Sequence, residues 1–214
     1  MILPKRLSLI ASMVDKGAVV ADIGTDHAHL PIYLVQSKVC PSALACDIKE
    51  LPLESGRQNI ELCHLEDKIK TRLSDGLSNI YADEADTFTI AGMGGDMIIH
   101  ILSSCPYIFD SKYTLVLQPM TKYHTLMSWL FDNGFEIIRQ ECTHEGKHCY
   151  TVIKVRFRGG KIPHTPEDEF LGKLDLSNEE NRLFLIKEIK KAEKRSIGDP
   201  SVIPVVEKLK EKLQ

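Results

Sequence analysis

Carboxylate and imidazole side chains gather in one short stretch near the start of the chain, from Asp22 to Pro31, which reads DIGTDHAHLP. The apolar run from Ala18 to Ala21 before it is typical of a buried strand, and the residues from Leu30 to Val35 can continue as a helix. In open α/β sheets, ligands bind where the carboxyl ends of strands and the amino ends of helices converge. The stretch therefore predicts a site for a nucleotide-like cofactor.

The charge of this turn indicates which cofactor it suits. Gly24 permits a sharp bend, and Asp47, at the end of the next apolar run, can hold ribose hydroxyls. Dinucleotide enzymes and class I methyltransferases, which bind S-adenosylmethionine, share this spacing. Asp26 stands where a pyrophosphate cradle has its second glycine, and its charge repels an anion but not a sulfonium cation. The turn therefore favours S-adenosylmethionine over a dinucleotide.

Two further strand ends carry residues that could contact a ligand. Asp75-Gly76 either forms a loop in which the Asp75 side chain makes hydrogen bonds to the local backbone, or it places the Asp75 carboxylate beside the adenine amino group of the donor. The run from Ala91 to Gly95 is too rich in glycine for mere helix entry, and it would let a flat substrate approach the donor closely. It lacks the acid or amide, two prolines and aromatic residue common in amino-group methyltransferases, which argues against an exocyclic amino acceptor.

Metal and thiol chemistry are not expected. His27 and His29 with Asp22 and Asp26 could suggest a metal site, but their turn is better explained by the cofactor, so no metal is predicted. The six cysteines form no Cys-x-x-Cys pair and are interpreted as reduced thiols that mostly fill the core. Trp129, the only tryptophan, is also expected in the core.

The elements that would position these residues alternate between strands and helices. The fifth strand is expected to stop at Pro119, and two strands, 135–142 and 148–157, form a hairpin through the turn at 145–147. The pattern predicts an α/β fold with a Rossmann-like, seven-stranded, mostly parallel sheet. The other strands are expected over residues 18–23, 43–47, 69–73, 87–91 and 113–117, and the helices over 3–15, 30–37, 51–65, 97–102 and 126–131.

A change of composition at residues 158–163, rich in Gly, Pro and charge, predicts a hinge. We therefore divide the chain into domains 1–158 and 159–214. Helices are expected over 166–174, 178–195 and 202–213, and Asn178 should cap the second of them. Leu183, Ile186 and Ile189 would share its apolar face. The basic residues of the helix over 178–195 form either a solvated face or a phosphate contact.

Composition limits the function classes. The chain has 214 residues, 43% of them hydrophobic, and a net charge of −3, so any RNA partner would need a local basic patch. There is no apolar run of the ~18 residues that cross a bilayer, nor a signal-peptide core, so no membrane association and a cytoplasmic location are expected. The sequence does not define the oligomeric state, and a monomer is slightly favoured.

Together these residues resemble the bacterial tRNA (adenine(22)-N1)-methyltransferase family, known as TrmK, across residues 5–156. The family implies a Rossmann-like domain that uses S-adenosylmethionine, followed by a helical, coiled-coil-like domain that helps hold tRNA. His29, Met120 and Thr151 depart from the residues usual in the family. The marks of the resemblance are Lys5-Arg6-Leu7, Gly17-Ala18-Val19, Asp22 to Pro31, Asp75-Gly76-Leu77, Ile90 to Gly95, Gln118-Pro119, Trp129-Leu130, and Gly146-Lys147 with Tyr150.

The resemblance implies N1-methylation of adenine 22. N1 has an in-plane lone pair that can attack the sulfonium methyl group directly, so positioning does most of the work. The product is cationic, and we predict Asp26 and His27 as catalytic residues, with Asp26 stabilising that charge or taking an N6 proton. The base must be unpaired or flipped out, because N1 lies on its pairing edge.

Two sets of binding residues complete this reading. We predict cofactor binding by Asp22, Gly24, Asp26, His27, Asp47, Ile48, Asp75, Gly76, Ala91, Gly92 and Met93. We predict substrate binding by Lys5, Arg6, Gly94, Gly95, Gln118 and Pro119.

Other functions remain open at this point. The chain could be a tRNA-binding protein with a vestigial donor site, or a methyltransferase for another RNA site or a small molecule. A small-molecule enzyme would have a lid over its pocket; no lid insertion is evident, although the loop at residues 78–86 leaves that reading open.

Overall fold

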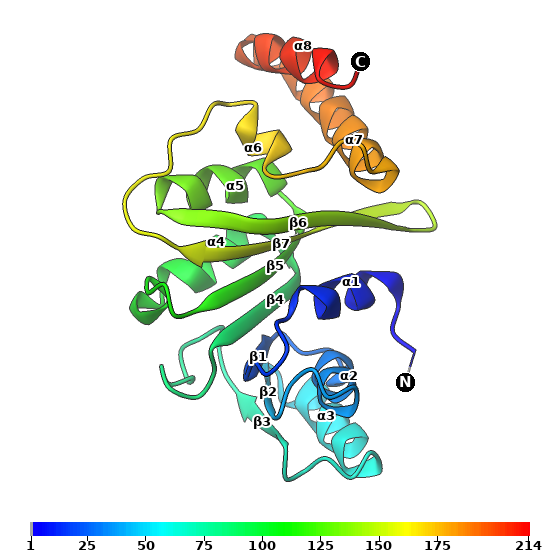
Figure 1. Cartoon of the computed structure of the whole chain (residues 1–214), viewed down its shortest axis with the longest axis vertical. Coiled ribbons are helices and arrows are strands. Elements are labelled where there is room, and N and C mark those ends of the chain that lie inside the picture. Colours follow the sequence, from blue (N-terminus) through cyan, green and yellow to red (C-terminus); the bar gives the residue numbers. More distant parts are fainter. Residues whose placement is uncertain (1) are drawn as a thin grey trace.

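Seven strands form one sheet in the order β3-β2-β1-β4-β5-β7-β6 in the computed structural model, which describes residues 2–214 (Figure 1). Strand β7 runs antiparallel to both β5 and β6, and the other neighbouring pairs are parallel. The predicted Rossmann-like, mostly parallel sheet with a hairpin at one edge is thus confirmed. The strands are β1 (Val20–Ile23), β2 (Ala43–Asp47), β3 (Ile69–Leu73), β4 (Thr87–Gly94), β5 (Thr114–Thr121), β6 (Phe135–Glu145) and β7 (His148–Phe157).

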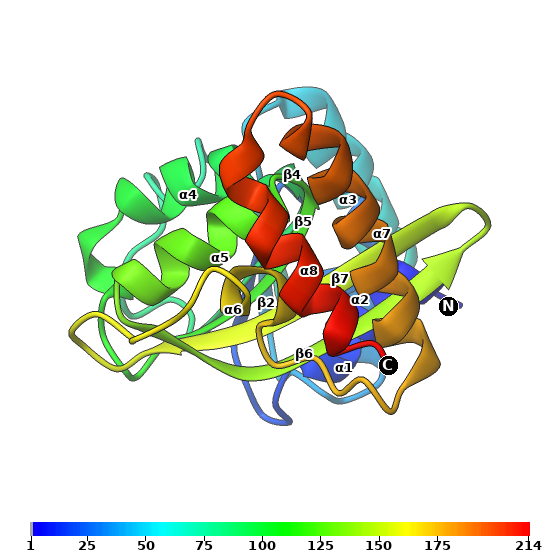
Figure 2. The same cartoon turned by 90° about the horizontal axis from the view of Figure 1, so that it is seen from above.

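Helices cover both faces of the sheet (Figures 1 and 2). Helices α1, α2 and α3 pack on one face through residues such as Ile10, Ile32 and Ile60, whereas α4, α5 and the hairpin bury Ile98 and Phe135 on the other. The helices of this part are α1 (Lys5–Met13), α2 (His29–Gln36), α3 (Glu50–Leu62), α4 (Gly95–Ser103) and α5 (Tyr123–Asp132), with a short 3₁₀ turn, η1 (Pro106–Ile108).

Alternation along β1 decides where its carboxylate points. Ala21 and Ile23 belong to the hydrophobic cluster beneath α4 and α5, whereas Val20 belongs to the cluster beneath α1, α2 and α3. Because successive side chains of a strand point to opposite faces, Asp22 lies on the same side as Val20. Asp22 therefore faces the side of the sheet that α1 covers.

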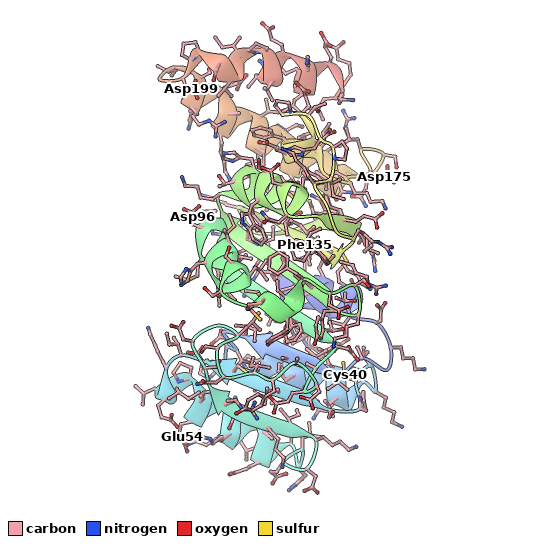
Figure 3. All side chains as sticks on the ribbon, turned by 90° about the vertical axis from the view of Figure 1, so that its left-hand side faces the viewer. Cys40, Glu54, Asp96, Phe135, Asp175 and Asp199 are labelled. Carbon is pink, nitrogen blue, oxygen red and sulfur yellow. The ribbon has the colours of Figure 1, made fainter. Side chains whose placement is uncertain are left out.

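The cores are filled mainly by aliphatic and aromatic side chains. Phe135 is fully buried and packs against Phe109, Trp129 and Phe157, and Figure 3 shows it among the side chains in the middle of the molecule. Trp129 is partly buried against this cluster, as predicted. The six cysteines are free, and burial raises the pKa of the Cys46 thiol to about 12. Reactive thiolates are therefore not favoured there.

Three strands extend beyond their predicted ends, and β6 is one of them, because it continues past residue 142 to Glu145. Strand β5 continues to Thr121, so the prediction that Pro119 stops it is wrong. Proline has no N–H to donate, but β7 pairs only with Leu115 to Leu117, and Pro119 lies opposite Met93 of β4 where the register shifts. Strand β4 likewise continues beyond Ala91, through this irregular pairing, to Gly94.

The chain after β7, about its last quarter, is mainly helical. It contains α6 (Asp168–Leu171), α7 (Glu179–Ser196), η2 (Pro200–Val202) and α8 (Ile203–Glu211), and α6 is shorter than the predicted helix over 166–174. Asn178 caps α7, as predicted, because its side chain accepts hydrogen bonds from the backbone N–H groups of Glu180 and Asn181. Leu183 is exposed, so its prediction as part of the packed face is wrong; the buried positions of α7 include Phe184, Leu185, Ile189 and Ala192.

These helices pack both on themselves and on the sheet. Phe170, Leu185, Ile189, Val206 and Leu209 belong to a small hydrophobic cluster of their own. Phe184 instead joins the main core, where its ring meets Tyr123 edge to face at 5.1 Å. The Asn181 side chain accepts a 2.9 Å hydrogen bond from the buried backbone N–H of Cys142 in β6. The division at residue 158 stays a prediction.

No helix in the described part of the chain has the length and apolar character needed to span a membrane.

Candidate active site

The turn between β1 and α2 has a backbone that only a few residue types adopt readily. Gly24 has a φ of +75°, and two consecutive non-glycine residues, His27 and Ala28, have φ of +54° and +56°. The backbone N–H groups of Gly24 and Thr25 both donate to the Cys46 carbonyl of β2, at 2.9 and 2.8 Å. These bonds fix the start of the turn against the neighbouring strand.

Helix α3 holds the other end of the turn. The Asn59 side-chain amide donates a 3.0 Å hydrogen bond to the His27 carbonyl. A Cβ atom on Gly56 would lie 3.4 Å from the Ala28 Cβ, so the helix backbone approaches the turn closely. The left-handed pair His27-Ala28, which costs an estimated 1–2 kcal/mol per residue, is thus supported by tertiary contacts.

The two carboxylates of this stretch occupy different environments. Asp22 is 5% exposed and accepts a 2.6 Å hydrogen bond from the Thr89 hydroxyl. Burial raises the pKa of Asp22, while the Thr89 bond and the charge of Arg6 act in the opposite direction. The side chain of Asp26 is 79% exposed, and its Oδ1 lies 3.5 Å from the His27 Nε2. Asp26, unlike Asp22, is therefore accessible to a large substrate.

A larger hollow of about 420 Å³ opens at the ends of β1, β2, β3 and β4. Asp47 lies at its border, and its Oδ1 accepts a 2.8 Å hydrogen bond from the Lys49 N–H, which fixes the loop after β2. Gly76 has a φ of +54°, and a Cβ there would lie 2.9 Å from the Ile101 side chain. The lining residues are Ile23, Gly24, Asp47, Ile48, Lys49, Pro52, Ser74, Asp75, Gly76, Ala91, Gly92, Met93, Met97 and Ile101.

A smaller hollow of about 190 Å³ lies beside it, toward α1. Gly24, Ala91 and Gly92 line both hollows, so together they form one elongated site across the carboxyl ends of β1 and β4. The smaller hollow is lined by Arg6, Leu7, Asp22, Gly24, Asp26, Leu30, Ala91 and Gly92.

Gln118 ties the N-terminal helix to this site. It is fully buried, and its Oε1 accepts hydrogen bonds from the Arg6 Nη1 and the Gly92 N–H, both at 3.0 Å. Its Nε2 donates to the Pro119 carbonyl at 3.0 Å. The Arg6 guanidinium also lies over the Tyr150 ring, 5.8 Å from its centre. Gln118 therefore fixes both Arg6 and the end of β4 through hydrogen bonds. Both Gln118 and Pro119 are buried.

The structure brings most of the predicted donor residues to this elongated site. Of the predicted cofactor set, His27 is the one residue that lines neither hollow, because its side chain is half-exposed on the outside of the turn. Of the predicted substrate set, Arg6 lines the smaller hollow, whereas Lys5 is exposed and lines neither. Their roles stay predictions.

The glycines Gly94 and Gly95 serve close packing. A Cβ on Gly95 would lie 2.5 Å from the Lys122 carbonyl, and one on Gly94 would lie 3.1 Å from the Thr121 hydroxyl. Their small size therefore admits the end of β5. This packing explains these two glycines without a substrate.

Several lining residues were not predicted. Pro52 and Met97 lie in the first turns of α3 and α4, directly after strand ends. That position in the sequence could have predicted that they line the site. Leu7 and Leu30 showed only helical periodicity. In an open parallel sheet, the first helical turn after each strand therefore contributes to the ligand site together with the strand ends.

A Rossmann-like sheet with carboxylates at the end of β1 and a site running along its carboxyl edge defines a methyltransferase domain. Residues 3–153 match the family described as "Methyltransferase domain". The chain belongs to the TrmK family of tRNA (adenine(22)-N1)-methyltransferases.

The relatives that support this assignment are known from sequence and structure. The tRNA (adenine(22)-N(1))-methyltransferase of Bacillus subtilis is 38% identical over 151 residues, a match that spans 71% of this chain and 63% of that protein. Sp1610 of Streptococcus pneumoniae, solved in complex with S-adenosyl-L-methionine, is 31% identical with a TM-score of 0.88 and full coverage of both chains. TrmK of M. capricolum, in complex with S-adenosyl-homocysteine, is 26% identical with a TM-score of 0.82, covering 100% of this chain and 98% of the other.

Proposed function

We propose that this protein is an S-adenosylmethionine-dependent tRNA methyltransferase that methylates N1 of adenine 22. The observation that carries the proposal is the elongated site along the ends of β1 and β4, with a buried carboxylate, Asp22, and an exposed one, Asp26, on the same turn. The TrmK relatives support both the donor and the substrate.

The residues of the larger hollow fit the adenosine part of the donor. Asp47 lies at the end of β2, where a carboxylate can accept hydrogen bonds from ribose hydroxyls. Asp75 is suited to the adenine amino group, and Met93, Met97 and Ile101 supply apolar contact for a flat ring. Gly24 leaves room that a side chain would fill, because a Cβ there would meet Met93 at 2.3 Å. The sequence-predicted donor site thus has a shape and a polarity that suit this cofactor.

Asp26 is the residue that we assign to charge stabilisation. When bound, S-adenosylmethionine supplies an electrophilic methyl group on a sulfonium sulfur. Methylation at N1 leaves a positive charge on the adenine, and an adjacent carboxylate stabilises it or accepts an N6 proton. The side chain of Asp26 is accessible at the smaller hollow, and the His27 Nε2 lies 3.5 Å from its Oδ1, which supports a role for His27 in orienting Asp26.

A second surface supports contact between the C-terminal helices and tRNA. A hollow of about 560 Å³ lies between the end of β5 and α7, and three cations, Lys122, Lys191 and Arg195, line it. Glu188 offsets one of them by pairing with Lys191 at 2.6 Å. Because Lys122 follows β5, this hollow lies on the same sheet edge as the donor site. We therefore take 159–214 as a tRNA-contacting domain beside the methyltransferase domain 1–158.

A monomer as the active unit stays a prediction from the sequence. Action on tRNA would place the protein in the cytoplasm.

The decisive test is a nucleoside assay. Unmodified tRNA with adenine at position 22 is incubated with protein and S-adenosylmethionine, digested, and analysed by mass spectrometry for 1-methyladenosine. The same tRNA with guanine at position 22 is the control. A gain of 1-methyladenosine only in the first tRNA is expected. Equal gain in both tRNAs would refute the site assignment, and no gain would refute the activity.

Calorimetry separates the enzyme from a tRNA-binding protein with a vestigial donor site. Saturable binding of S-adenosylmethionine is expected of the enzyme. Binding of tRNA without binding of the donor would favour the vestigial site.

A further inference from the structure

The β6–β7 hairpin extends past the ends of the neighbouring strands. Because β7 runs antiparallel to β5, its first residues lie toward the carboxyl end of β5, at the edge of the sheet where the elongated site opens. Figure 1 shows the hairpin projecting beyond β4 and β5, with α1 on one side of it and α7 on the other. The tip of the hairpin therefore stands next to the proposed donor site.

One face of the hairpin is open near its tip. Val152 of β7 belongs to the hydrophobic cluster beneath α1, α2 and α3, so Tyr150 and His148 point to that same side by alternation. The other side faces the main core, against which Cys149 packs. Arg6, in the first turn of α1, lies over the Tyr150 ring, so α1 begins at the level of Tyr150. His148, nearer the tip, is exposed.

The side chains on this open face form a short row. The rings of His148 and Tyr150 are nearly parallel, with an angle of 20° between their planes and 6.1 Å between their centres. The Arg6 guanidinium continues the row, 5.8 Å from the centre of the Tyr150 ring. The buried Gln118 fixes this end of the row, because its Oε1 accepts a 3.0 Å hydrogen bond from Arg6. Tyr150 is partly exposed and His148 is exposed, so a flat ligand can reach the rings.

The charges around the row suit a nucleic acid. None of the ion pairs among the described residues includes Arg6 or Lys147, an exposed lysine at the hairpin turn. Glu145 pairs opposite His148 and offsets one of these two cations, so the face remains positive. Unpaired RNA bases stack on aromatic rings and on guanidinium planes, and free cations attract the phosphates. The row therefore matches an unpaired nucleotide.

The location of the rings points to a neighbour of the target base. Tyr150 and His148 line neither hollow, whereas Arg6 lines the smaller one and separates it from the Tyr150 ring. A base on the rings would thus lie beside the donor and away from its methyl group. When adenine 22 is extruded, the adjacent bases lose a stacking partner, and a protein ring can replace it.

We propose that Tyr150 and His148 stack the base of a nucleotide adjacent to adenine 22, with Arg6 and Lys147 near its phosphates. The inference rests on the proposed function and names a further contact of the same substrate. It also agrees with the substrate contact predicted for Arg6 from the sequence. Gln118 is then a positioning residue, because it orients Arg6 at the end of the row.

A double-mutant cycle between protein and RNA tests this contact. Two tRNAs, with an abasic nucleotide on the 5′ or the 3′ side of adenine 22, are compared with the complete tRNA in equilibrium binding. S-adenosylhomocysteine is present throughout. The wild type should bind one of the two abasic tRNAs about tenfold more weakly, as expected for one lost stacking contact. Tyr150→Leu should bind the complete tRNA about tenfold more weakly, but it should lose little more with that abasic tRNA, since the same contact is already absent.

Two further variants serve as controls. Tyr150→Phe keeps the ring and should behave like the wild type. Tyr81→Leu removes a tyrosine that is 71% exposed and lines neither hollow, so it should retain both the wild-type affinity for tRNA and the full loss with the abasic tRNA. Calorimetry with S-adenosylmethionine should give the same donor affinity for Tyr150→Leu as for the wild type. An equal loss of donor and tRNA affinity would show that the ring only supports Arg6.

The comparison of tRNAs on the wild type needs no variant to fold. If the wild type binds both abasic tRNAs as tightly as the complete one, no neighbouring base is stacked and the inference is overturned, while the proposed function stands. The same conclusion follows if the abasic loss is as large in Tyr150→Leu as in the wild type. If the wild type binds no tRNA and forms no 1-methyladenosine, the proposed function itself fails.

Discussion

Gly24 and Met93 lie so close together that a Cβ atom on Gly24 would be 2.3 Å from the Met93 Cε. Gly24 also has a left-handed φ of +75°. This glycine therefore serves both the bend after β1 and the space at the centre of the proposed donor site, and the two roles can be separated experimentally.

Gly24→Ala should weaken donor binding by about tenfold or more and destabilise the fold by about 1–2 kcal/mol, because the methyl group displaces Met93 and strains the backbone. Calorimetry and thermal unfolding measure the two effects. Gly17→Ala is the matched control, since Gly17 has a φ of +90° but open space around its Cα. It should lose stability without losing donor affinity. Equal losses of affinity in both variants would show that strain alone is responsible.

Asp26→Ala should lower the turnover of tRNA methylation by about a hundredfold or more while changing donor affinity by less than about tenfold. The reason is that, in the proposed mechanism, the exposed Asp26 carboxylate would stabilise the positive charge that develops on adenine. Single-turnover rates and donor titrations give the two numbers. Asp26→Asn keeps the size of the side chain and should be nearly as slow. Turnover close to that of the wild type in either variant would remove Asp26 from the chemistry.

Asp22→Asn should stabilise the protein at neutral pH and should weaken the binding of the donor. Burial raises the pKa of Asp22, so the folded state holds its proton more tightly than the unfolded chain does. The stability that this carboxyl contributes is present below its unfolded pKa and is lost as the pH rises through its folded pKa. The advantage of the variant should grow as the pH rises above the ordinary carboxyl pKa of 3.8, toward about 1 kcal/mol. Thermal unfolding across this range measures it; an advantage independent of pH would contradict the argument.

His124→Gln should make the protein less sensitive to acid. The His124 ring stacks on Phe170, and burial, followed by the charge of Arg195, lowers its pKa to about 4. The neutral ring therefore stabilises the fold above the unfolded pKa of 6.5, and this contribution is lost as the pH falls toward 4. Because His124 is only about half-buried, the effect is modest: the melting temperature should fall about 1–2 °C less in the variant between pH 7 and pH 4.5. Parallel pH profiles for the two proteins would contradict this assignment.

Local patterns were sufficient to predict most of the sheet and the turn after β1. The bounds of β2, β3 and β7 follow from short apolar runs between turn residues, and Asp47 and Asp75 lie at strand ends as expected. Strand β5 shows where such patterns fail. Pro119 is a local breaker, but its effect depends on whether a neighbouring strand needs its N–H, which is a tertiary property.

The support of the site was not visible in the sequence. Arg6 and Gln118 meet across 112 residues of chain, and no periodicity relates them. The glycines after β4 illustrate a second limit, because Gly95 is small to admit the Lys122 carbonyl. A sequence shows that space is needed there, but only the packing shows what fills it.

The turn after β1 is fixed at both ends. The Cys46 carbonyl binds its start, and Asn59 and Gly56 of α3 contact its other end. These contacts affect how the turn binds a ligand. A loop that is already shaped loses little conformational freedom when its ligand arrives, so more of the contact energy is retained as affinity. The same contacts make the shape of the turn depend on α3: a larger residue at position 56 or a loss of Asn59 would deform the turn, although neither residue lines either hollow.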